Sequence, residues 1–331
     1  MSSVCTFYHF VKLEALEDLQ AQIQRQCLAL GLKGTVLLAP EGINGTLTGA
    51  RSALEQYQAW LQQDACFAPM PFKYSAANPD NPVFLRLKVR IKPEIVALGR
   101  PDLDPAQRTG EHVDADTWNA LLDDPDVIVI DTRNSYEVGV GTFPGAIDPG
   151  TRSFREFPQY VSSQLDPERT PRVAMFCTGG IRCEKASAYL LEQGFTAVYQ
   201  LDGGVLRYLE TASDNRWQGE CFVFDQRVTV TPSLDEGRYV QCHACRTPLS
   251  VADQASGQYA EGLSCPHCFD QLTPEQRAAF EERRRQEALA QARGERHVGA
   301  EMDRQRARKR SAQAARVAAA QQVAATRDAQ A

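Results

Sequence analysis

The chain has 331 residues, of which 43% are hydrophobic and 24% charged, values that are ordinary for a globular protein of two or three domains. Lys and Arg number 36 and Asp and Glu 42, so the net charge of −6 excludes a protein that coats nucleic acid indiscriminately. No apolar run has the length of a membrane span and no signal peptide is evident, so we expect a cytoplasmic chain without a membrane partner. Ten cysteines in a reducing compartment predict metal ligands or reactive thiols rather than disulfides.

The first predicted domain covers residues 1–98 and alternates strands with helices. A tight reversal is predicted at 43–46, because Asn-Gly tolerates positive φ at both central turn positions. The other elements, read from β-formers and from apolar residues at helical spacing, are a strand, a helix, a strand and a helix at 4–10, 13–27, 34–39 and 52–61. With one more strand the order becomes β-α-β-β-α-β, which predicts an α/β domain of the ferredoxin-like (acylphosphatase-like) class.

That further strand is predicted at 83–91, where apolar and other side chains alternate strictly. Its second face carries Phe84, Arg86, Lys88 and Arg90. Such a face is most often the solvent side of an antiparallel sheet, but it also suits an RNA phosphate backbone and a base. Arg86, Lys88 and Arg90 are therefore candidate RNA-binding residues.

The second predicted domain covers residues 111–219, after a connector rich in Pro and Gly. Asp114 or Asp116 can cap a helix that runs through Leu122. Three short apolar runs are of the kind found in parallel sheets covered on both faces, at 127–130, 173–176 and 196–201. Together with a helix at 184–193 they predict an α/β domain with a mostly parallel sheet.

A reactive cysteine is predicted where the strand 173–176 ends. Cys177 comes next, Gly179 and Gly180 let successive N–H groups turn toward one point, and Arg182 adds a positive charge at the start of a helix. Such surroundings lower the pKa of a thiol and favour the thiolate. The alternative is a small apolar cysteine in a glycine turn. Cys183 is either a resolving thiol for Cys177 or a helix residue that packs inward.

Four more cysteines form two C-x₂-C pairs in a module that spans residues 237–271. Nineteen residues separate the pairs, a spacing typical of a closed, structural zinc site. The predicted ligands are Cys242, Cys245, Cys265 and Cys268; the alternative is four free thiols in a loop.

The tail, residues 274–331, has 13 basic and 8 acidic residues, so the rest of the chain is more acidic than the total suggests. Arg308, Lys309 and Arg310 belong to its densest basic run. We expect a charged, helical and partly disordered tail, which is either a solvated helix or an electrostatic arm for a polyanion.

The cysteine loop resembles a rhodanese active site. Asp131-Thr132-Arg133, Glu137 and Pro144-Gly145-Ala146-Ile147 resemble the Asp-x-Arg…Glu…Pro-Gly-Ala-Ile signature in the first half of that domain. Four residues separate Cys177 from Arg182, as in rhodaneses, whereas the related dual-specificity phosphatases have five. The resemblance therefore implies a cysteine persulfide rather than a phosphocysteine.

Nearly the full chain resembles the bacterial tRNA uridine(34) hydroxylases. The resemblance lies, in this order along the chain, in the segments LAPEGINGTLTG, FLRLKVRIKPEIVALG and FCTGGIRCEKAS, the CHAC…CPHC pairs and the segment ARGERHVG. It implies hydroxylation of the wobble uridine of tRNA to 5-hydroxyuridine, with O₂ as co-substrate, an electron donor and Cys177 as the active-site cysteine. The implied RNA partner is the tRNA anticodon loop.

The residues themselves do not explain how dioxygen would be activated. The sequence contains no flavin or nicotinamide motif and no evident His/carboxylate iron site. Two other functions stay open: a sulfurtransferase that carries a Cys177 persulfide to a tRNA base or a small acceptor, and a non-enzymatic RNA-binding adaptor.

Overall fold

The computed structural model describes residues 2–76, 84–169 and 172–292. The chain divides into two compact units, Met1–Asp270 and Gln271–Ala331. The first unit holds two α/β domains and a cysteine-rich module, and the second contributes helix α9 (Pro274–Ala292). Among the residues described, none of the helices combines the length and the apolar character that a bilayer crossing requires.

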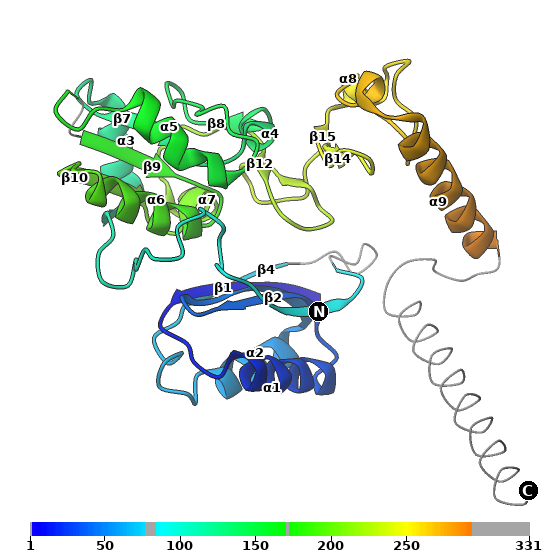
Figure 1. Ribbon diagram of the computed structural model, residues 1–331, viewed down its shortest axis with the longest axis horizontal. Helices are drawn as coiled ribbons and strands as arrows, with labels where there is room; N and C mark the ends of the chain where they lie inside the picture. Colours follow the sequence, from blue (N-terminus) through cyan, green and yellow to red (C-terminus); the bar gives the residue numbers. More distant parts are fainter. Residues whose placement is uncertain (1, 77–83, 170–171, 293–331) are drawn as a thin grey trace, which may run out of the picture. The chain divides into compact units, whose positions relative to one another are not determined.

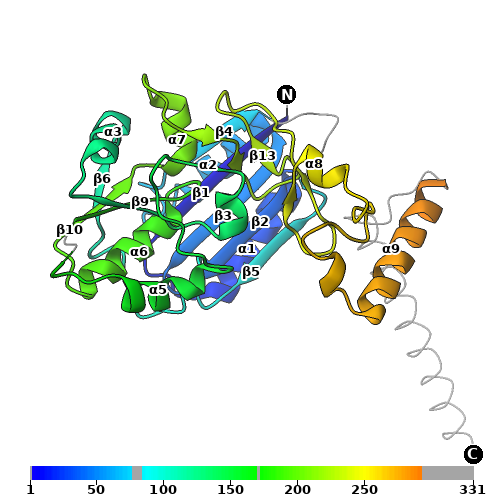
Figure 2. The ribbon, with the colours of Figure 1, turned by 90° about the horizontal axis from the view of Figure 1, so that it is seen from above.

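The N-terminal domain is a five-stranded sheet with two helices on one face (Figure 1). Its helices are α1 (Leu16–Ala29) and α2 (Arg51–Leu61). The strands lie side by side in the order β4-β1-β3-β2-β5 (Figure 2), with bounds β1 Ser2–Phe10, β2 Lys33–Ala39, β3 Gly42–Ala50, β4 Phe72–Ala76 and β5 Leu87–Ile91. Alternate apolar side chains such as Phe7, Val36 and Leu47 pack beneath the helices into one core. The predicted ferredoxin-like, acylphosphatase-like class is thereby confirmed.

Two details of this domain correct the sequence analysis. The fourth strand of the β-α-β-β-α-β pattern is β4, and the predicted strand at 83–91 is a fifth one, β5, which begins only at Leu87 and runs parallel to β2. The reversal predicted at 43–46 was also wrong, because the chain turns at Pro40 and Glu41. Gly45 lies inside β3, where an added Cβ would collide with the ring of Phe7. This glycine therefore serves close packing rather than a turn.

The second domain is built on a parallel four-stranded sheet in the order β6-β10-β9-β7. The strands are β6 Glu111–Val113, β7 Ile128–Asp131, β9 Arg172–Phe176 and β10 Ala197–Leu201, and the helices around them are α3 Ala115–Asp123, α4 Ser135–Val138, α5 Phe157–Gln164, α6 Ile181–Glu192 and α7 Gly204–Thr211. Asp114 caps α3, as predicted, by accepting a hydrogen bond of 2.9 Å from the N–H of Thr117. Two core clusters, one on each face of the sheet, bury the central strands and confirm the α/β class.

Short antiparallel pairs join this domain to the cysteine-rich module. Strand β8 (Gly141–Thr142) pairs with β11 (Gln218–Gly219), and β12 (Cys221–Phe222) pairs with β13 (Thr229–Val230). In the module, β14 (Val240–Gln241) pairs with β15 (Pro248–Leu249), followed by α8 (Val251–Gln254).

The helix-free face of the N-terminal sheet contacts the second domain. Tyr8 in β1 donates a hydrogen bond of 3.3 Å to Glu184 in α6, and Lys73 in β4 donates one of 3.1 Å to the carbonyl of Gly203. These contacts place the N-terminal domain over the carboxyl end of β9, where Cys177 lies.

Candidate active site

Cys177 directly follows β9, the central strand that lies between β7 and β10. Active sites of parallel sheets gather at the carboxyl ends of such strands. The side chain is only 1% exposed and contributes to the wall of a cavity. A nucleophile held there can react only with a molecule that enters the cavity.

The loop after Cys177 turns its amides toward the sulfur. The N–H of Gly180 donates to Cys177 Sγ at 3.1 Å. The carbonyls of Cys177 and Thr178 accept hydrogen bonds of 2.9 and 3.1 Å from Val205 and Leu206 in α7, which hold the loop in place. Gly180 has φ of +100°, a conformation that a side chain would strain. The structure thus places both predicted glycines where their amides can stabilise a sulfur anion.

The electrostatics at Cys177 favour the thiolate. Burial alone would raise the pKa of this thiol, but a hydrogen bond from Cys183, the positive charge of Arg182 and the loop amides of Arg182 and Gly179 together lower it to about 5. The pKa of Cys183 is raised well above its usual value by burial and by the neighbouring Cys177. Of the two thiols, Cys177 is therefore the one that the surroundings hold as a thiolate.

Arg182 is tied to a buried carboxylate that the sequence analysis did not pair with it. Its two terminal nitrogens donate hydrogen bonds of 2.7 Å each to the two carboxylate oxygens of Glu137. Glu137 is completely buried at the N-terminal end of α4. This bidentate pair fixes the guanidinium beside the loop and balances its charge.

Two further signature residues, Asp131 and Arg133, hold the segment that carries Glu137. Arg133 is fully buried, donates two hydrogen bonds to Asp131 and also donates to the carbonyls of Glu137 and Gly141. Asp131 in turn accepts a hydrogen bond of 2.9 Å from Thr142. The Asp-x-Arg segment therefore positions the segment that carries Glu137 and does not itself line the cavity.

Cys183 occupies the first turn of α6, next to the reactive loop. It is fully buried, packs in the same apolar cluster as Cys177 and lies 3.6 Å from the hydroxyl of Thr132. The side chain therefore packs inward, as one of the two interpretations predicted. Because it also donates a hydrogen bond to Cys177, its role as a resolving thiol stays a hypothesis.

Tyr8 brings the N-terminal domain to the cysteine loop. Its hydroxyl donates to Glu184, which is also bonded to His112 at 2.9 Å. A Cβ added to Gly180 would lie 2.8 Å from this hydroxyl, so the absence of a side chain at 180 admits the ring. Sequence reasoning missed Tyr8, because the contact joins residues 176 positions apart.

The cavity has a volume of about 400 Å³ and is walled by both domains. The N-terminal domain contributes Tyr8, Leu37 and Lys73, the second domain contributes Cys177 and its loop, and the connection between β12 and β13 contributes Phe224. Phe224 is 61% exposed, and the guanidinium of Arg182 lies 5.6 Å from the centre of its ring. A ligand of this cavity would contact a thiolate, a cation, a phenol and an aromatic ring.

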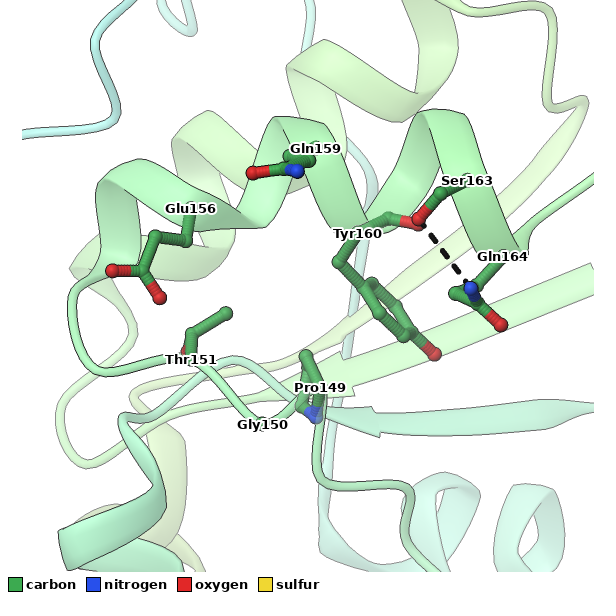
Figure 3. Close-up of a pocket in the computed structure, with 8 residues that line it drawn as sticks. All are labelled: Pro149, Gly150, Thr151, Glu156, Gln159, Tyr160, Ser163 and Gln164. Carbon is green, nitrogen blue, oxygen red and sulfur yellow. Dashed lines mark hydrogen bonds between the residues drawn. The ribbon is translucent and has the colours of Figure 1, made fainter.

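A hollow of similar size, about 410 Å³, lies between α5 and the loop at 149–151 (Figure 3). Its wall includes Glu156 and Tyr160 but no cysteine, lysine or arginine. It therefore offers neither a thiol nor a cation, and we place the candidate active site in the cavity at Cys177.

The three predicted RNA-binding residues of the N-terminal domain, Arg86, Lys88 and Arg90, lie outside the cavity wall. In the register of β2 and β5, Lys88 pairs with Thr35 and Arg90 pairs with Leu37. Because Leu37 lines the cavity, Lys88 and Arg90 project from the sheet face that covers the cavity. Arg86, just before β5, is exposed. Arg308, Lys309 and Arg310 lie outside the described residues.

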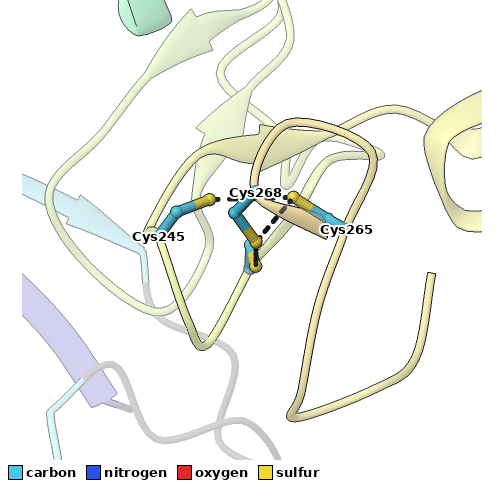
Figure 4. A group of neighbouring side chains, drawn as sticks. Cys245, Cys265 and Cys268 are labelled. Carbon is cyan, nitrogen blue, oxygen red and sulfur yellow. Dashed lines mark hydrogen bonds between the residues drawn. The ribbon is translucent and has the colours of Figure 1, made fainter. Parts of the chain in front are cut away.

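The four cysteines of the module converge on one point (Figure 4). All four Sγ atoms lie within 4.8 Å of one another, and the closest pairs, Cys245–Cys265 and Cys265–Cys268, are 3.7 Å apart. Tetrahedral Zn²⁺ with bonds of about 2.3 Å needs sulfurs about 3.8 Å apart. Cys242, Cys245, Cys265 and Cys268 therefore form a group that can hold a metal ion such as zinc.

Comparison with known proteins yields matches for both domains. Residues 2–95 match the UPF0176 acylphosphatase-like domain, and residues 114–211 match the rhodanese-like domain. Among solved structures, the chain is similar to a rhodanese-like domain from Anabaena sp., with 20% identity, coverage of 34% of this chain and 80% of the other, and a TM-score of 0.29. It is also similar to an acylphosphatase from Coxiella burnetii, with 11% identity, coverage of 27% and 92%, and a TM-score of 0.22.

Proposed function

Because the chain belongs to the family of rhodanese-domain proteins that begin with the UPF0176 acylphosphatase-like domain, we propose that it hydroxylates the wobble uridine of tRNA to 5-hydroxyuridine. The observation that carries the proposal is the position of Cys177. Its sulfur, which has a pKa of about 5, lines a cavity that both domains enclose. An anticodon-loop base is already splayed out and can enter such a cavity.

The proposed reaction replaces hydrogen with a hydroxyl group at C5 of uracil. One atom of O₂ enters the base and the other leaves as water, so the reaction consumes two electrons and two protons from a donor, which we define only as a two-electron reductant. The protein's part is to bind the base and hold a sulfur anion beside it. The amide of Gly180 and the charge of Arg182 stabilise that anion, whether it is a thiolate or a persulfide.

We further propose that the cysteine-rich module binds one zinc ion through Cys242, Cys245, Cys265 and Cys268. The four sulfurs fill all positions of a tetrahedral site, so the metal would stabilise the fold of the module and not take part in the chemistry.

The experiment that tests the function uses heavy-isotope dioxygen. The purified protein is incubated with unmodified tRNA, a reductant and ¹⁸O₂, and the digested nucleosides are analysed by high-resolution mass spectrometry. We expect heavy oxygen in the wobble uridine, and loss of the product in Cys177→Ser. Sulfur at that position without heavy oxygen would overturn the proposal in favour of a sulfurtransferase.

The sulfurtransferase is the second candidate because one observation favours it. The loop between Cys177 and Arg182 has the length that suits a single sulfur atom, and its amides point toward that sulfur. High mass resolution is essential, because adding oxygen and exchanging oxygen for sulfur change the nominal mass equally. A product that forms equally well in Cys177→Ser would favour the third candidate, a binding adaptor that copurifies with the true enzyme.

A further inference from the structure

Lys73 is a cation that the N-terminal domain brings into the cavity beside Cys177. It lies in β4, is half-buried and lines the cavity together with the cysteine loop. Its Nζ donates a hydrogen bond of 3.1 Å to the carbonyl of Gly203, at the start of α7. The side chain thus crosses from one domain to the other over the mouth of the reactive loop.

Among the described residues, the ammonium of Lys73 has no carboxylate within ion-pair distance. Asp202, Glu210 and the Cys177 thiolate act on it only at longer range, and Asp202 is paired with Arg207 at 2.8 Å. An ammonium has three N–H donors, and one described bond leaves two of them for another partner. A half-buried cation without a counter-charge in direct contact is costly unless an anion binds there.

The surroundings of Lys73 match this interpretation. Burial lowers the pKa of its ammonium, which means that the cavity without a ligand disfavours the charge. Gly203 leaves the space that Nζ occupies, since an added Cβ would lie 2.5 Å from it. Gly203 also has φ of +68°, so this position suits glycine on two grounds.

The size and chemistry of the cavity indicate which kind of anion would bind at Lys73. A volume of about 400 Å³ is in the range of small-ligand sites, and its wall combines apolar side chains such as Leu37, Val96 and Phe224 with the ammonium of Lys73. A nucleotide has the matching parts: a flat base for the apolar wall and a phosphate for the cation.

We propose that Lys73 binds a phosphate group of the RNA strand whose base enters the cavity at Cys177. This inference rests on the proposed function, because it takes RNA as the substrate. It makes the acylphosphatase-like domain a part of the substrate-binding site. Lys73 would act by holding the strand in place.

The first test measures the salt dependence of tRNA binding for the full chain, Lys73→Met and Lys73→Arg. Loss of one phosphate contact should reduce the slope of log K against log salt by about 0.7 and weaken binding about tenfold at 0.1 M salt. Lys73→Arg should restore most of the salt slope and most of the affinity. Lys12→Met removes the same charge from an exposed site of the same domain and serves as control. An unchanged slope in Lys73→Met, with its thermal unfolding as in the parent, would overturn the proposal.

The second test is independent of RNA and probes the site with inorganic phosphate. The rate of Cys177 alkylation by iodoacetamide is measured with phosphate or chloride at equal ionic strength. We expect phosphate to slow alkylation of the parent protein and of Lys73→Arg but not of Lys73→Met, each rate being compared with that of the same variant in chloride. Equal protection of Lys73→Met would show that phosphate does not bind at Lys73 and would refute the phosphate site. If the parent protein binds no tRNA, the proposed function fails, and this test still decides whether Lys73 binds phosphate.

Discussion

Lys185 and Glu41 form a buried ion pair between the two domains, with Nζ 2.7 Å from Glu41 Oε2. The same ammonium lies 2.6 Å from Glu94, in the segment that links the domains. Lys185 belongs to α6, the helix that follows the reactive loop. The pair therefore fixes the position of the catalytic loop relative to the sheet that covers it.

Replacing Lys185 by Met should strongly destabilise the protein, because it leaves two buried carboxylates without a cation. Breaking a buried ion pair from one side typically costs about 3–5 kcal/mol. Glu41→Gln should lower the free energy of unfolding by less, since Lys185 keeps Glu94 as a partner. Urea unfolding measures these differences, and Lys12→Met, at an exposed site, serves as control. A loss below about 1 kcal/mol in Lys185→Met, the size expected for a surface pair, would contradict the role given to this pair.

The pKa of about 5 at Cys177 predicts the pH dependence of its alkylation. The thiolate fraction, and with it the rate with iodoacetamide, should stay nearly constant from pH 6 to pH 8 and fall as the pH drops through 5. Cys66 is the matched control, because burial and Asp64 raise the pKa of its thiol to about 11 and its rate should still rise at pH 9. A Cys177 rate that rises tenfold per pH unit between 7 and 8 would refute the lowered pKa.

The same shift affects stability with a definite sign. The folded state releases the thiol proton above about pH 5, whereas a cysteine in the unfolded chain keeps it to near its ordinary pKa of about 8.5. The contribution of Cys177 to stability is therefore present above the unfolded pKa and is lost as the pH falls toward 5. The difference in urea midpoint between the parent protein and Cys177→Ser should be larger at pH 8.5 than at pH 5.5.

Arg182→Gln should raise the pKa of Cys177, because it removes the nearest positive charge and leaves Glu137 unpaired in the interior. We expect a more alkaline alkylation profile and a lower unfolding midpoint. Arg182→Lys should recover only part of the low thiol pKa and part of the unfolding midpoint. An ammonium cannot donate to the two oxygens of Glu137 in the geometry of a guanidinium. The double variant Arg182→Gln with Glu137→Gln should regain stability but not the low thiol pKa. An unchanged alkylation profile in Arg182→Gln would exclude Arg182 as the source of the shift.

The parts of the site that the sequence predicted are those held within one segment. Cys177, the two glycines and Arg182 lie within six residues, and a strand-loop-helix pattern determines their geometry. The partners that it missed are distant along the chain: Glu137 lies 45 positions from Arg182, and Gly203 lies 130 positions from Lys73. Such pairs depend on how the domains pack and leave no periodic signal.

The same reasoning explains the errors in the N-terminal domain. Strand β4 has only five residues, Phe72–Ala76, over which an alternation is too short to stand out, whereas the longer alternation at 83–91 belongs to an added edge strand. Asn44-Gly45 has the composition of a turn, but packing against Phe7 sets the choice of glycine there. At Gly45, tertiary contact overrode the local preference for a turn.

Metal removal should unfold the cysteine-rich module and leave the reactive cysteine intact. Metal analysis of the purified protein should find about one zinc per chain, and Cys265→Ser, which removes a buried ligand, should lose it. After chelation, proteolysis should cut within residues 237–271, because a structural zinc site supplies much of the folding free energy of such a small module. Cys177 alkylation should keep its rate, since none of the four ligands lines its cavity. A metal-free protein whose module still resists proteolysis would refute the zinc site, and a matching loss of Cys177 reactivity would refute its purely structural role.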